Sequence, residues 1–207
     1  MLVVQTKPIN VKKLIVLLLL TLPLAGMAQE DGIGLRLGEP FSVTFKKFVD
    51  DRFAFEGMVG RAGANSSRYY IRSFDNNRPS PNAFYASHAA SSALSLNFRA
   101  SLHEDISDYF DISQGYLLAY AGLGVQLRSV RVDYAYTDPA IIVGSLPPVL
   151  RENRTNLDLG PEVFGGAEYY FDDLPISVFG ELGMFMELVD RIGHLRLQGA
   201  IGIRYLF

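Results

Sequence analysis

The chain has 207 residues, which is room for one domain, and it carries 19 basic against 22 acidic side chains, a net charge of −3. This acidic balance argues against a nucleic-acid partner. The chain has no cysteine, so neither disulfides nor thiol chemistry can stabilise its fold or drive a reaction.

The first 28 residues have the composition of a secretory signal peptide. Lys7, Lys12 and Lys13 precede the apolar residues 14–24, and small residues lead up to Ala28, after which we predict cleavage. A transmembrane helix needs about 20 apolar residues, so this stretch is too short to be one. We therefore predict an exported domain over residues 29–207, with 16 basic and 22 acidic side chains and a net charge of −6.

Residues 32–49 alternate apolar and polar side chains, as a strand with two different faces does. They form either one strand or two strands joined near Gly38-Glu39-Pro40, which makes the total seven or eight. Bacterial single-chain barrels have an even number of strands. We therefore predict two strands, the first at 32–38 with Arg36 on its inner face.

A short turn at 50–52 leads into the next predicted strand, 53–59. If the strands on either side of this turn pair as a hairpin, Lys46 lies directly opposite Glu56 on the inner face.

Two further strands are predicted at 91–102 and 116–130. The first alternates leucine and phenylalanine with polar residues and places Arg99 on the polar face. The second has Leu118 and Tyr120 among its inner residues, so its two faces are less distinct.

The last three predicted strands, 155–171, 176–188 and 195–207, share one pattern. Each alternates apolar residues with residues that are charged, polar or small, and the charged residues all fall on one face. The charged residues of that face are Asp158, Glu162, Glu168, Glu181, Glu187, Arg196 and Arg204. This is the pattern of strands that face lipid on one side and a polar interior on the other.

These strands predict an all-β fold, an eight-stranded antiparallel up-and-down transmembrane β-barrel. A membrane is crossed only by helices or closed barrels, because unpaired backbone groups cost several kcal/mol in hydrocarbon. The short connections 50–52, 103–114 and 172–175 are predicted to be periplasmic turns. The long connections 64–89 and 131–154 are predicted to be extracellular loops.

The chain ends in the alternating apolar residues Ile201, Ile203, Tyr205 and Phe207. With the signal peptide and the strand pattern of 155–207, this ending resembles the small bacterial outer-membrane barrels of the OmpA and OmpX type. The resemblance implies an outer-membrane location. It also implies that the final residues are an assembly signal, read by the outer-membrane assembly machinery.

The inward charges are the main candidate site. They comprise Arg36, Lys46, Glu56, Arg99, Asp158, Glu162, Glu168, Glu181, Glu187, Arg196 and Arg204. An eight-stranded barrel has an interior just wide enough to be filled by side chains. We therefore predict a sealed lumen crossed by an ion-pair network, and a structural or surface-interaction role.

Two other functions remain open. A lipid-modifying barrel enzyme, like the lipid A deacylases, needs a histidine near a serine, and His88 and Ser91 are a loose match to such a pair. A soluble periplasmic binding barrel of the lipocalin type needs an apolar cavity and a polar exterior. The charge pattern favours neither, so we predict no catalytic residue.

The 64–89 segment concentrates cationic and aromatic side chains, a composition typical of binding surfaces and of the membrane interface. These possible loop contacts are Arg68, Tyr69, Tyr70, Arg72, Phe74 and Arg78. The acidic 103–111 segment is read as a solvated turn, and neither a metal site nor a cofactor is predicted. The expected partners are outer-membrane lipid, lipopolysaccharide and the assembly machinery.

Overall fold

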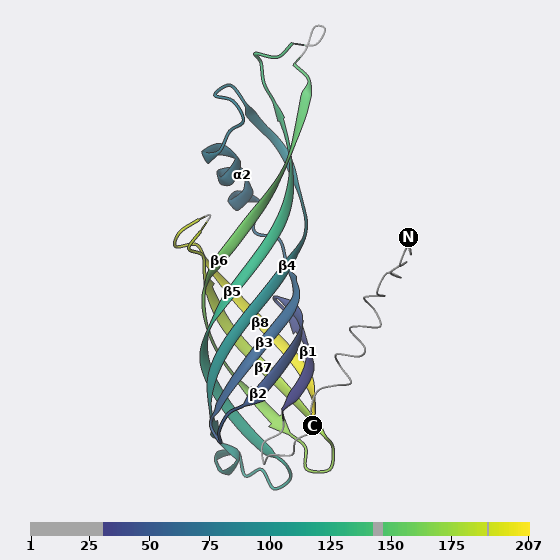
Figure 1. Cartoon of the computed structure of the whole chain (residues 1–207), viewed down its shortest axis with the longest axis vertical. Coiled ribbons are helices and arrows are strands. Elements are labelled where there is room, and N and C mark those ends of the chain that lie inside the picture. The colour runs from purple at the N-terminus through teal and green to yellow at the C-terminus, as the bar shows by residue number, and fades with distance from the viewer. Residues whose placement is uncertain (1–30, 143–146, 190) are drawn as a thin grey trace, which may run out of the picture.

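The computed structural model describes residues 31–142, 147–189 and 191–207, so the predicted signal peptide lies outside the described residues. Eight strands follow one another around a single closed sheet (Figure 1). They are β1 (Gly32–Gly38), β2 (Phe41–Phe48), β3 (Phe53–Ala62), β4 (Phe84–Asp105), β5 (Tyr116–Thr137), β6 (Val149–Tyr170), β7 (Ile176–Met186) and β8 (Leu195–Leu206). Each strand pairs antiparallel with its neighbours, and β1 pairs with β8, which confirms the predicted eight-stranded barrel.

The division of residues 32–49 into two strands is also confirmed. The chain reverses after Gly38, where it passes so close to β8 that a Cβ atom would lie 2.2 Å from the Gly199 carbonyl oxygen. Only glycine fits such an approach. In the hairpin formed by β2 and β3, Lys46 lies directly opposite Glu56, as predicted.

The barrel wall has an apolar outer face and a polar inner face, because side chains alternate across each strand. The outer face exposes large apolar side chains, among them Leu35, Val43, Val59, Phe98, Leu123, Val163, Leu182 and Ile203. The inner face of the same strands buries charged side chains, among them Arg99, Glu162 and Arg204. This arrangement suits a barrel surrounded by lipid and is the reverse of a lipocalin-type binder.

One end of the barrel, which we call the turn end, holds both ends of the described chain and the β2–β3, β4–β5 and β6–β7 connections. There the backbone amide of Phe207 donates to the Asp31 carbonyl oxygen at 2.9 Å. The β4–β5 connection forms a 3₁₀ turn, η1 (Ser107–Phe110). Within the described residues no helix is long and apolar enough to cross a membrane.

At the opposite, extended end, three strands continue beyond the barrel (Figure 1). β3 pairs with β4 no further than Ala93, and β7 pairs with β6 only from Glu162 onward. β5 nevertheless pairs with both β4 and β6 up to Thr137. The result is a three-stranded sheet, which we call the extension, and one helix, α2 (Ser67–Asn76), lies against it.

The extension corrects the prediction of long loops at 64–89 and 131–154, because 84–89, 131–137 and 149–154 are strand. The period of two continues there, but the polarity of the faces is reversed. Val132 and Tyr134 are fully buried on the side that continues the lumen, whereas Arg131 and Asp133 are exposed on the side that continues the lipid face. The sequence prediction required apolar residues on the outer face. It therefore ended each of these strands where the outer face becomes polar, which is too early.

α2 corrects a second prediction, that the aromatic rings of this segment lie exposed at a binding surface or at the membrane interface. Tyr69, Tyr70 and Phe74 are at most 1% exposed and form a core cluster with Val132 and Tyr134 of β5. An amphipathic helix buries its apolar side against another element. The arginines of the segment, Arg68, Arg72 and Arg78, remain exposed as expected.

Candidate functional site: the lumen and its mouth

The lumen nearest the turn end is crossed by a group of four charges from four strands. Lys46 on β2 donates to Glu168 on β6, with Nζ 2.7 Å from Oε2. Arg204 on β8 lies between Glu168, at 2.7 Å, and Glu56 on β3. Opposite charges therefore meet across the lumen, as buried charges must if their desolvation is to be offset.

A second group lies deeper, around Arg99 of β4. Its guanidinium donates two hydrogen bonds to Glu162, at 2.7 and 3.0 Å, and a third to Glu181 at 2.7 Å. Arg36 of β1 donates to the same Glu181 at 2.7 Å. A planar guanidinium can hold two carboxylates in a fixed geometry, which a lysine cannot. We call these two groups together the inner network.

An uncharged layer separates the inner network from the extended end. Gln198 donates to the side-chain oxygen of Gln126 at 2.8 Å, and Gln126 donates to Ser95 at 3.1 Å. All three side chains are at most 5% exposed. The layer thus places three buried polar side chains, joined by hydrogen bonds, across the lumen.

The mouth at the extended end is occupied by the start of the segment that carries α2. The Gly63 carbonyl oxygen accepts from Arg128 at 2.6 Å, and the Asn65 side-chain oxygen accepts from Arg196 at 2.7 Å. Arg196 also pairs with Glu39 in the β1–β2 turn at 3.0 Å. We call these residues, with Tyr69, Asp158 and Glu187, the mouth cluster.

Two acids of the mouth cluster, Asp158 and Glu187, are bound by groups that the sequence did not associate with them. Asp158 pairs with Arg128 at 3.2 Å. Glu187 accepts from the Tyr69 hydroxyl at 2.8 Å and from the Arg191 backbone amide at 2.7 Å. The segment from Gly63 to Tyr69 is therefore tied to opposite sides of the barrel.

Burial shifts the pKa of two groups near the mouth. It lowers the pKa of His194, whose ring lies 5.1 Å from that of Tyr69, and the neighbouring Arg191 and Arg196 lower this pKa further. Burial also raises the pKa of the Tyr70 hydroxyl. Both shifts favour the neutral form of the side chain.

The structure brings nine of the eleven predicted lumen residues into the barrel interior: Arg36, Lys46, Glu56, Arg99, Asp158, Glu162, Glu168, Glu181 and Arg204. Asp158 lies at the mouth end of this interior. Arg196 and Glu187 lie at the mouth itself, where the β7–β8 ladder ends with the pairs Phe185–Arg196 and Met186–Leu195. Their predicted positions on the inner side were right, but they bind the segment that fills the mouth.

Sequence reasoning missed Arg128, which is 1% exposed and joins Asp158 to the Gly63 carbonyl. A signal was present, because the alternation of β5 that places Leu127 outside places Arg128 inside. Glu39 and Asn65 had no such signal, since both lie in connections where no strand periodicity applies.

The predicted assembly-signal residues all lie on the outer face of β8 or at its end. Ile201, Ile203, Tyr205 and Phe207 are 66, 47, 56 and 38% exposed. The Phe207 ring lies 6.4 Å from that of Phe45 on β2. The final side chains are thus displayed on the barrel surface.

The residues considered for catalysis do not form a nucleophile and base. The His88 ring nitrogen Nδ1 lies 2.6 Å from the Tyr85 hydroxyl, and the Ser91 hydroxyl donates to the Arg131 carbonyl at 3.3 Å. Since a base must reach its nucleophile directly, this pair gives no support to an acyl-transfer site. Among the described residues no group of three or more histidine, aspartate or glutamate side chains could hold a metal ion.

A closed eight-stranded barrel with an apolar exterior and a charged interior is the architecture of a small transmembrane β-barrel. No protein-family model and no curated protein matches the chain.

Solved structures of this class are similar to the chain in fold. The N-terminal β-barrel domain of Pseudomonas aeruginosa OprF is 11% identical, with a TM-score of 0.48 over 86% of this chain and 96% of that one. Neisserial surface protein A (NspA) is 14% identical, with a TM-score of 0.40 over 86 and 94%. Ail of Yersinia pestis, solved in complex with the heparin analogue sucrose octasulfate, is 8% identical, with a TM-score of 0.36 over 87 and 100%.

Proposed function

We propose that the protein is a sealed outer-membrane barrel with a structural role, and that it presents its extension at the cell surface. The observation that carries the proposal is the filled lumen: the inner network, the uncharged layer and the mouth cluster follow one another along the barrel. An open pore would need a continuous path past these groups. An enzyme would need a reactive pair, and the histidine considered for it bonds to a tyrosine.

The orientation follows from the general architecture of such barrels. Their termini and short turns lie in the periplasm, and their longer connections lie outside. The turn end would therefore face the periplasm, and α2 and the extension would stand above the outer leaflet.

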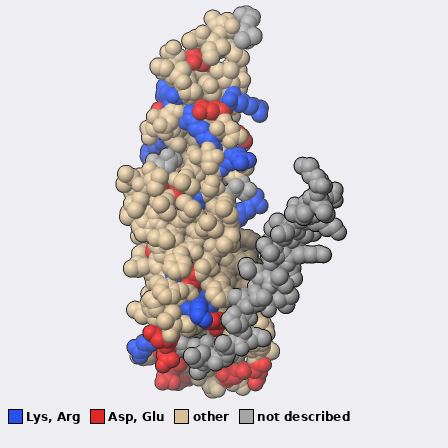
Figure 2. All heavy atoms as spheres, viewed as in Figure 1, with Lys and Arg blue, Asp and Glu red and all other residues tan. Residues whose placement is uncertain are grey.

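The charge distribution supports a surface role. Figure 2 shows acidic side chains gathered at the turn end and basic side chains along the extended half. The exposed bases of this half include Arg61, Arg68, Arg72, Arg131 and Arg151. Guanidinium groups bind phosphate oxygens in a fixed geometry, so lipopolysaccharide is the partner that fits this surface.

Single-channel recording in planar bilayers tests the sealed lumen. The native protein should show no stable conductance at moderate voltage. Replacing both mouth arginines, Arg128→Ala with Arg196→Ala, should leave this unchanged, because the inner network still blocks the path. Stable, ohmic channels formed by the native protein would rule out the sealed barrel.

A further inference from the structure

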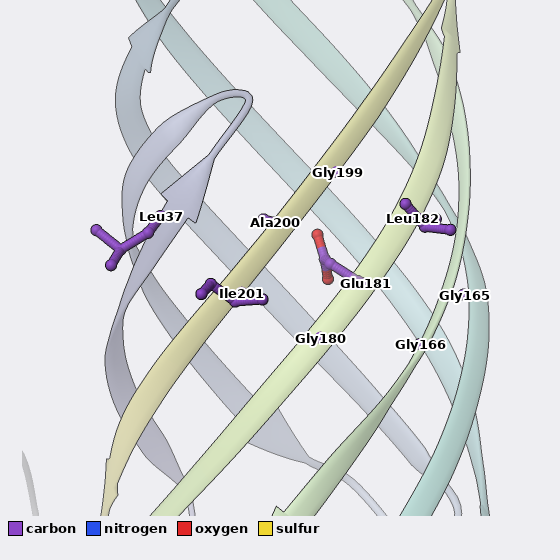
Figure 3. Close-up of a pocket in the computed structure, with 9 residues that line it drawn as sticks. All are labelled: Leu37, Gly165, Gly166, Gly180, Glu181, Leu182, Gly199, Ala200 and Ile201. Atoms are coloured by element: carbon purple, nitrogen blue, oxygen red, sulfur yellow. The ribbon is translucent and has the colours of Figure 1, made fainter.

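The lipid-facing wall formed by β6, β7, β8 and β1 is hollowed near its middle. The hollow has a volume of about 630 Å³, within the range of small-molecule binding sites. Its floor is made of glycine and alanine, and Leu37, Leu182 and Ile201 stand around it (Figure 3).

The outward-facing glycines of this floor are not required by the fold, unlike the inward-facing Gly166, whose Cβ atom would lie 2.3 Å from the Gly180 carbonyl oxygen. Gly165, Gly180 and Gly199 face outward, and none of them has the positive φ that excludes other residues. A Cβ atom on Gly180 would meet nothing within 4 Å, and one on Gly199 would meet only the mobile end of Leu182 at 3.1 Å and a carbonyl oxygen at 3.8 Å. The space above them is therefore free for a group from outside the chain.

The hollow offers hydrocarbon and no charge. Glu181 lies behind the wall and is 5% exposed. Its carboxylate accepts from Arg36 and Arg99 at 2.7 Å each, and from the Tyr120 hydroxyl at 3.2 Å. An occupant would thus contact an apolar surface and needs to be apolar itself.

A second hollow, of about 400 Å³, adjoins the first towards the turn end. It is lined by Ile33, Gly34, Leu35, Val43, Ile176, Ile203, Tyr205 and Arg204, and the Arg204 residue is only 2% exposed. Leu37 pairs with Ile201 in the first hollow, and Leu35 pairs with Ile203 in the second. These two pairs are successive outward-facing pairs of the β1–β8 ladder, so the two hollows are neighbours. Together they lead from the middle of the wall to the exposed ring of Tyr205.

We propose that this path binds one acyl chain of a phospholipid whose head group lies at the turn end. The occupant follows from continuity with the lipid-facing surface, from the largely apolar lining, and from the way the path reaches an exposed tyrosine at one interface. Tyrosine is enriched where lipid head groups begin. A flexible chain can follow two adjoining hollows, and every methylene in them gains contacts that a flat wall does not give.

The test compares two glycines that are equivalent except for the hollow. Gly57 of β3 also faces outward, and its Cβ would likewise meet nothing within 4 Å, but it lies on the opposite side of the eight-stranded ring. Gly180→Leu and Gly57→Leu would be extracted from membranes in mild detergent, and heat-modifiable migration on gels would confirm that both fold. Native mass spectrometry would then count the bound phospholipids.

The native protein and Gly57→Leu should retain one phospholipid through washing, and Gly180→Leu should lose it. Equal retention by the two variants, or no retained lipid in the native protein, would overturn the proposal. A second copy of the chain is the rival occupant. Since the chain has no cysteine, Gly180→Cys introduces a single thiol, and efficient disulfide dimers in membranes without retained lipid would show that a second copy fills the hollow instead.

Discussion

At the scale of single residues, Arg99 is the centre of the inner network. It binds Glu162 and Glu181 at 2.7 Å and lies 3.9 Å from Glu56, with 1% of its side chain exposed. Arg99→Met would leave these carboxylates buried without their counter-charge. We expect the free energy of unfolding to fall by about 3–5 kcal/mol, measured by urea unfolding in lipid vesicles.

Arg52→Met is the matched control for this substitution. Arg52 pairs with Glu104 at 3.3 Å, but its side chain is 70% exposed. An exposed pair contributes about 0–1 kcal/mol, so this variant should unfold like the native protein. Similar losses for the two variants would mean that the inner network does not stabilise the barrel.

The residues of the inner network could be predicted from the sequence, but their partners could not. Alternation along a strand decides which side chains point inward, and the register decides which positions are opposite. Lys46 does lie opposite Glu56, yet its ammonium group reaches across the lumen to Glu168, and Glu56 binds Arg204 instead. In a narrow barrel a long side chain can reach partners on several strands. The alternation along one strand does not indicate which of these partners it binds.

At the scale of elements, the barrel strands were predicted well where lipid imposes one polarity on the outer face. β7 and β8 begin at the predicted residues. β1 ends at Gly38, as predicted from the rule that such barrels have an even number of strands. β4, β5 and β6 were predicted too short, because beyond the barrel the polar face turns outward and α2 covers the other face. The helix itself was missed within a segment whose aromatic residues suggested an exposed loop.

The last strand provides a prediction of its own. In the folded barrel Phe207 is 38% exposed and its ring makes one aromatic contact, so its removal should have little effect on stability. If the final side chains are an assembly signal, as the resemblance to small outer-membrane barrels implies, Phe207→Ala should sharply reduce the folded barrel in cells. The measurement is the fraction with heat-modifiable migration in outer-membrane preparations.

Phe98→Ala on β4 controls for the loss of an outward aromatic ring. Phe98 is 58% exposed and lies 5.7 Å from Phe55, a contact comparable to that of Phe207. Both variants should refold equally into detergent micelles, and only Phe207→Ala should assemble poorly in cells. Equal assembly of the two would contradict a role of Phe207 as a signal.

At the scale of the whole molecule, the barrel and the extension are held together by different forces. The barrel has a charged interior and an apolar exterior, whereas the extension has an ordinary core under α2 and a polar outer face. The extension is therefore the part that resembles a soluble domain. Its stability should depend on that core and not on the inner network.

Phe74 tests this division. It is fully buried, and its ring lies 5.4 Å from Tyr134 and 5.8 Å from both Tyr85 and Tyr136. Replacing a buried phenylalanine by alanine costs about 3–5 kcal/mol, which is enough to unfold a small unit locally. Phe74→Ala should therefore expose Arg68 and Arg72 to rapid cleavage by trypsin, while the barrel keeps its heat-modifiable migration.

The same variant links the extension to its proposed role. If the arginines of the extended half bind lipopolysaccharide, Phe74→Ala should weaken binding to lipopolysaccharide vesicles, and added salt should weaken binding by the native protein, because exposed charges are screened. Asn76→Ala is the control, since Asn76 is an exposed residue at the end of the same helix. Loss of the barrel in Phe74→Ala would show that the two parts unfold as one, and unchanged binding after cleavage would place the contact on the barrel rather than on the extension.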